Sequence, residues 1–206
     1  SSTASRQEQV QKAFIAYYGR PADPSGLTYW ASQLDTAGGN WSAIIESFGN
    51  STEATALLAG LTNEQKIDKL YTQMFGRSAD SGGRAYYAAG LSNGSFTLAS
   101  LAVNIINGAA GSDATTVANK LASSQLFTAS LNSSNTSSYN SNSVTAVRDF
   151  LAGITTTAAT QASINTALTT MVAAGGGTTS SSIAGTYTVR MDTGDSATFV
   201  VAQDGT

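Results

Sequence analysis

Two short stretches of the chain carry an arginine and an aspartate at the same spacing. Arg20 stands three positions before Asp23, and Arg77 stands three positions before Asp80, 57 residues further along. A guanidinium beside a carboxylate is suited to holding an acidic sugar. The alternative is structural: the Asp caps a following helix, and the Arg holds loop carbonyls or the carboxylate. The duplication favours the structural interpretation, and the four residues remain candidate ligand-binding residues.

Aromatic side chains near these stretches suggest a second kind of chemistry. Stacking on a saccharide would suit the rings of Tyr29, Trp30, Trp41, Tyr86 and Tyr87, although core packing is the usual role of aromatics spaced along helices. Trp30 follows the apolar stripe of its segment and is expected to be buried. Trp41 comes just after two glycines and an asparagine, so we expect an exposed ring there and add it to the candidate ligand-binding residues.

Catalytic and metal chemistry is less well supported. The chain has no His and no Cys, so it contains no Ser-His-Asp triad, thiol nucleophile or thiolate metal site. No phosphate-binding loop or nucleophile elbow appears, and we expect no enzyme. Asp192, Asp195 and Asp204 could gather around calcium. The EF-hand order and the glycine-rich nonapeptide repeat are absent, which favours a plain acidic turn.

Composition narrows the class of protein. Of 206 residues, 41% are hydrophobic and 11% are charged, with a net charge of −3, so the chain can bury a core and owes its solubility to neutral polar residues. The acidic balance argues against a nucleic-acid partner, and no apolar run is long enough for a membrane span. We expect an exported protein of the bacterial cell surface. Its export signal was removed, or lies uncleaved at the C-terminus, or is missing because the polypeptide is a fragment.

The Arg-Asp stretches join predicted helices. Ser5-Arg6-Gln7-Glu8 and Thr62-Asn63-Glu64-Gln65 are capping boxes, and each precedes a helical apolar stripe that ends at Gly19 or Gly76. After each glycine, the Asp begins another helix, near 24–35 or 81–91. The sequence therefore predicts a mainly α fold, a multi-helix bundle built on a duplicated helix-loop-helix unit.

The whole chain divides into three predicted parts. Residues 1–174 are predicted as an α-helical domain, with later helices at 113–123, 125–132, 143–153 and 158–174 and a mobile Ser/Asn-rich loop at 132–143. Residues 175–182 are predicted as a flexible linker. The β-segment 183–206 has the pattern of a hairpin around Asp192-Thr193-Gly194-Asp195, and the closing Asp204-Gly205 turn favours the start of a β-domain.

The repeated pattern resembles a known family. Tyr18-Gly19-Arg20, Asp23, Gly26-Leu27 and Tyr29-Trp30 are similar to the motif of the domain of unknown function DUF4214. Residues 9–60 resemble one unit and residues 66–108 a second, in which Arg84 stands where the family has Leu. The resemblance implies a helical module of secreted bacterial proteins such as S-layer proteins, type I-exported adhesins and some exported hydrolases.

Three functions follow as hypotheses. The first is a non-catalytic extracellular module of an S-layer or adhesin-like protein, acting by self-assembly or by attachment to surface polysaccharide or lipopolysaccharide. The second is an accessory or targeting domain of a type I-secreted enzyme. The third is a small glycan-binding module.

Overall fold

The computed structural model describes residues 3–176, 185–190 and 196–201. Within these residues it contains ten α-helices, two short 3-10 helices and two strands. In chain order the elements are α1 (Thr3–Tyr18), α2 (Pro24–Thr36), η1 (Trp41–Ala43), α3 (Ile45–Gly49), α4 (Thr52–Leu58), α5 (Asn63–Phe75), α6 (Ser81–Asn93), α7 (Leu98–Asn107), α8 (Gly111–Ala129), η2 (Thr136–Ser138), α9 (Val144–Ala152), α10 (Gln161–Ala174), β1 (Gly185–Arg190) and β2 (Ser196–Val201).

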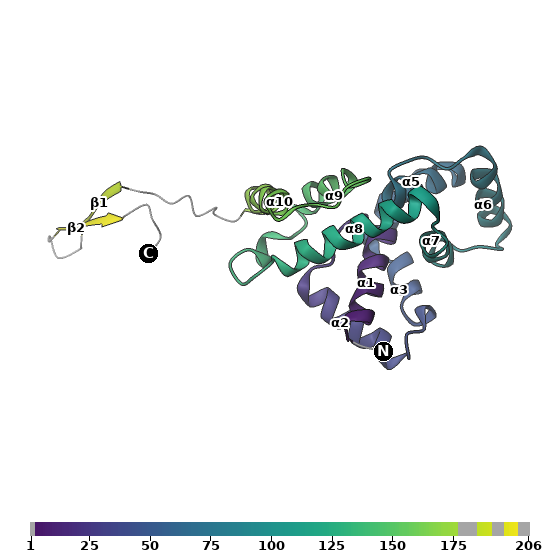
Figure 1. Cartoon of the computed structure of the whole chain (residues 1–206), viewed down its shortest axis with the longest axis horizontal. Coiled ribbons are helices and arrows are strands. Elements are labelled where there is room, and N and C mark those ends of the chain that lie inside the picture. Colours follow the sequence, from purple (N-terminus) through teal and green to yellow (C-terminus); the bar gives the residue numbers. More distant parts are fainter. Residues whose placement is uncertain (1–2, 177–184, 191–195, 202–206) are drawn as a thin grey trace.

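The folded body is all-helical, and α1 lies at its centre. The second half of this helix is buried on every side, from Val10 to Tyr18 apart from the half-buried Lys12, because it packs against α2, α5, α7 and α8. The long α8 also contacts α5, α9 and α10, and Figure 1 shows it crossing the middle of the body. A smaller apolar cluster joins α8, α9 and α10 through Phe127, Val147 and Ile164. Within the described residues, no helix is both long and apolar enough to cross a bilayer.

The predicted helix ends around the two loops are confirmed. Gly19 and Gly76 have left-handed φ angles of 64° and 71°, which glycine adopts at little cost. The Asp23 and Asp80 carboxylates accept the free amides of Gly26 and Gly83, at 2.9 and 2.7 Å. Both aspartates therefore cap the helices that follow them, α2 and α6.

Capping predictions elsewhere had different outcomes. The capping box at Thr62 is present, with Gln65 as its partner, so the start of α5 is confirmed. The box predicted at Ser5 does not begin a helix, because α1 already starts at Thr3. The two helices predicted at 113–123 and 125–132 form the single helix α8, since Ser123 and Ser124 lie buried on its packed face instead of in a turn.

The Ser/Asn-rich segment predicted as a mobile loop is instead tied down. Asn140 donates to the carbonyls of Ser137 and Gly175, and the buried Ser143 hydroxyl donates to the Ser138 carbonyl. These side chains form local turns because short polar groups bond readily to nearby backbone. The segment thereby holds the Tyr139 ring against Phe127 of α8.

The predicted hairpin is not supported as a folded unit. The backbone of β1 pairs antiparallel with that of β2, from Gly185 opposite Val201 to Arg190 opposite Ser196. The sheet has no third strand among the described residues, and a lone strand pair is marginal in water. The turn at 191–195, the rest of the linker from 177 on and the possible β-domain start at 202–206 lie outside the described residues.

Candidate functional site

Arg20 lines a hollow beside the first loop. Its guanidinium makes a two-pronged contact with Glu53 of α4, at 2.7 and 2.8 Å. It also donates to the Pro21 carbonyl and the Tyr139 hydroxyl, and stacks near the rings of Phe14, Tyr18 and Tyr139. Burial lowers the pKa of Arg20, but the contacts with Glu53 and Tyr139 more than offset this effect. The guanidinium is thus a charged structural anchor, with most of its donors already used.

A second arginine shares the same carboxylate. Arg148 of α9 donates from Nη2 to Glu53 at 2.7 Å and from Nε to the Tyr18 carbonyl at 2.8 Å. Two part-buried guanidiniums therefore surround one carboxylate, which gives this trio an excess of positive charge. The carboxylate joins the first loop to α4 and α9, three segments that are far apart in the sequence.

The hollow has a volume of about 450 Å³. Its wall contains polar groups from three segments: Asp23, Thr52, Tyr139, Asn140 and Ser141. Asp23 caps α2 through Oδ2, which also accepts from the Ser25 hydroxyl. Burial raises the pKa of Tyr139 to about 12, against the opposing effect of the Arg20 charge, so its hydroxyl stays protonated and bonded to the Pro21 carbonyl at 2.6 Å. Hydroxyl, amide and carboxylate groups of this kind can bind the hydroxyls of a sugar.

The second loop is built alike but lies on the surface. Arg77 pairs with Asp113 at 2.6 and 2.9 Å, donates to the Ser78 carbonyl, and approaches the rings of Tyr71 and Phe75. Its side chain is 44% exposed, against 13% for Arg20. Arg77 and Asp80 therefore hold the loop in shape, and the structure does not bring them together with Arg20 and Asp23.

The remaining predicted residues divide between the core and the region outside the described residues. Trp41 does not present the exposed ring that we expected: it is half-buried and packs against the main core. Asp192, Asp195 and Asp204 lie outside the described residues. Over the described ranges, no three acidic, His or Cys side chains cluster as metal ligands would.

Sequence reasoning missed the residues that complete the first site. Glu53, Tyr139 and Arg148 lie 33, 119 and 128 positions after Arg20, and no local pattern links them to the loop. Arg84 was visible as a departure from the family motif, but its role was not. It bonds Asp68 and the Ala79 carbonyl, which makes it a structural partner of the second loop.

A known family matches one part of the chain. Residues 45–110 match the sequence model of the family described as Domain of unknown function (DUF4214). The matched segment runs from α3 to Ala110 and contains the second loop. The first loop, at residues 19–23, precedes it. Among curated proteins and solved structures, none matches this chain.

Proposed function

We propose that this chain, whose residues 45–110 form a DUF4214 domain, is a non-catalytic extracellular module of a bacterial surface protein that attaches to cell-surface polysaccharide or lipopolysaccharide. In this proposal its helical body is built on a duplicated helix-loop-helix unit, and the first copy has become the binding site.

The hollow beside the first loop is the observation that carries the proposal. Its wall combines Asp23, Thr52 and Ser141, while Arg20 is already paired with Glu53 and the Tyr139 hydroxyl is already bonded to the Pro21 carbonyl. A site of this composition favours a neutral sugar over an acidic one, because both guanidiniums are bonded to Glu53 and the Asp23 carboxylate in the wall balances their remaining positive charge. The low content of charged residues in the chain, 11%, agrees with a partner recognised through hydroxyl groups.

A matched pair of variants tests the proposal. Asparagine preserves a helix cap but removes the charge, so Asp23→Asn and Asp80→Asn are expected to fold alike. Retention on immobilised lipopolysaccharide is expected to fall for Asp23→Asn and to stay unchanged for Asp80→Asn. Loss of retention in both variants, or in neither, would contradict a site at the first loop.

Self-assembly is the competing mode of action. Sedimentation of the wild-type protein, with and without calcium, separates the two. Large assemblies that form without retention on lipopolysaccharide would favour a lattice protein over an attachment module.

A further inference from the structure

The two loop-helix segments share eight identical residues between positions 19–34 and 76–91, and seven of the eight pairs have a structural explanation. The glycines at 19 and 76 have left-handed backbone. The arginines hold the following carbonyl and a carboxylate. The aspartates cap a helix.

Four more shared pairs are explained by close packing. The alanine pairs Ala22/Ala79 and Ala31/Ala88 are buried. A Cβ at Gly26 or Gly83 would approach the capping carboxylate to 2.8 or 3.2 Å. Leu34 is fully buried, and its counterpart Leu91 packs against the same core.

The eighth pair, Tyr29 and Tyr86, lies at the edge of the core. These two side chains are 56% and 65% exposed, and they are the exposed large hydrophobic residues of the described chain. Each ring meets the next aromatic edge to face, Tyr29 with Trp30 at 5.0 Å and Tyr86 with Tyr87 at 5.2 Å. Tyr86 also meets Phe96 edge to face at 5.7 Å. These contacts orient the rings and leave more than half of each side chain open to solvent, so packing alone does not explain why both copies carry tyrosine.

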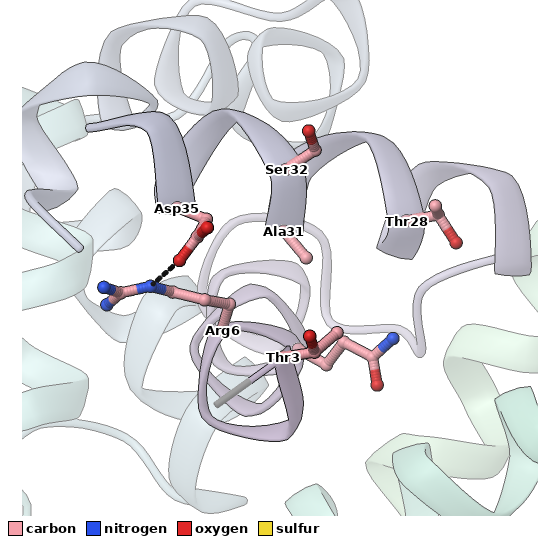
Figure 2. A pocket seen from close by; sticks show the side chains of 7 residues that line it. Thr3, Arg6, Thr28, Ala31, Ser32 and Asp35 are labelled. Carbon is pink, nitrogen blue, oxygen red and sulfur yellow. Dashed lines mark hydrogen bonds and ion pairs between the residues drawn. The ribbon is translucent and has the colours of Figure 1, made fainter. Parts of the chain in front are cut away.

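The surroundings of Tyr29 indicate the chemistry of a partner. Its neighbour Thr28 lines a hollow of about 270 Å³ between α1 and α2, together with Thr3, Gln7 and Ser32. Figure 2 shows the one ion pair there, in which Arg6 Nε donates to Asp35 at 3.1 Å. The Arg6 guanidinium also lies directly over Gly39, so its charge is held against the protein. The hollow thus offers hydroxyl and amide groups one position along α2 from the exposed ring, although the ring itself does not line it.

We infer that Tyr29 and Tyr86 are two equivalent stacking contacts for a repeating, uncharged saccharide. A sugar places its apolar C–H face on an aromatic ring while its hydroxyls bond polar side chains. Neither α2 nor α6 has an unpaired cation near the tyrosine: α2 contains no basic residue, and Arg84 of α6 is paired with Asp68. Two like contacts on different helices suit a polymeric ligand. Once one tyrosine has bound the polymer, the second contact forms at a raised effective concentration, which strengthens the overall binding. This inference rests on the proposed attachment to polysaccharide but uses a surface other than the hollow at the first loop.

Retention on immobilised lipopolysaccharide, competed with the lipid-free polysaccharide released from the same preparation, tests the inference. Tyr29→Ala and Tyr86→Ala are each expected to weaken retention several-fold, and the double variant by more than about tenfold, as lost ring contacts and lost bivalency combine. Tyr→Phe at both positions is expected to restore retention, because stacking needs the ring. Thr36→Ala, at an exposed position on α2, is the matched control and is expected to behave as wild type.

Three other outcomes would overturn the inference, and they show whether the proposed function fails with it. If wild type is retained and the double alanine variant is retained equally, the tyrosines are not contacts and the proposed function stands. If wild type is not retained, the proposed function and the inference both fail. If the alanine variants lose self-association in sedimentation but keep glycan binding, the partner of the rings is a second copy of the chain. Thermal unfolding of every variant should match wild type, since the exposed rings contribute little to the core.

Discussion

The side-chain amide of Gln73 donates to the backbone carbonyl of Ala16 at 3.1 Å. The two residues are 57 positions apart, which is also the spacing of the two loops. Gln73 on α5 therefore meets its own counterpart on α1, and the two similar helix pairs face each other at this point. The Oε1 atom of Gln73 is buried and has no hydrogen-bond partner.

Gln73→Met is expected to be well tolerated. It takes a donor from the buried Ala16 carbonyl in the last turn of α1, but it also removes the unsatisfied buried acceptor of Gln73, and the two effects are of similar size, about 1 kcal/mol each. The free energy of unfolding from urea titration should change by less than about 1 kcal/mol. A loss of several kcal/mol would show that the contact between the helix pairs depends on this bond.

Gln11 is expected to matter more than its counterpart Asp68. Gln11 accepts the Ala22 amide and donates to Thr128, which in turn donates to the Ala22 carbonyl, and all three residues are buried. Gln11→Ala should lower the free energy of unfolding by about 2 to 4 kcal/mol, because these polar groups lose their partners away from water.

Asp68→Ala is the matched control for Gln11→Ala. Asp68 accepts the equivalent amide of Ala79 and pairs with Arg84, but both side chains of the ion pair are about one third exposed. Water can replace part of the interaction, so the expected loss in urea unfolding is roughly 1 kcal/mol. Equal losses for the two variants would contradict the role assigned to burial.

Glu53→Ala is expected to destabilise the first loop strongly. Arg20 and Arg148 would lose their shared carboxylate while staying part-buried, at an expected cost of about 3 kcal/mol. Asp113→Ala breaks the more exposed pair with Arg77 and should cost less than about 1 kcal/mol. Chemical denaturation of both variants gives the comparison, and a larger loss for Asp113→Ala would refute it.

Because Lys120 is buried, we expect the stability of the protein to depend on pH in an unusual way. The side chain is fully buried, its ammonium donates to the Leu151 carbonyl at 2.6 Å, and burial lowers its pKa to about 8. Between pH 8 and the unfolded pKa of about 10.4, the unfolded chain binds more protons at this site than the folded chain. Stability therefore rises with pH across this window, as Lys120 becomes neutral in the folded protein.

The expected gain from pH 7 to pH 9.5 is about 2 kcal/mol. Above pH 10 the tyrosines with raised pKa values, Tyr17 and Tyr139, work in the opposite direction, so measurements should stop below that point. Lys120→Met keeps much of the side-chain volume and should abolish the rise in urea titrations. A rise of the same size in this variant would assign the effect to other groups.

Local sequence determined where several helices begin and end. Asp23, Thr62 and Asp80 cap the helices that follow them, and Gly76 closes α5, because these interactions involve residues three or four positions apart. The all-helical body followed from the same patterns. Ser123 and Ser124 look like turn residues in sequence but lie on the packed face of α8, where tertiary burial overrides local preference.

Only the tertiary structure decided what each shared side chain does. Arg20 and Arg77 share a local motif, yet Arg20 is part-buried against Glu53 and Tyr139, while Arg77 stays on the surface with Asp113. Tyr29 and Trp30 are adjacent aromatics, and the helix rotation of about 100° per residue turns one ring to solvent and the other toward Phe48. Such differences depend on which distant segment packs against each face, and that information is not contained in the spacing of the motif.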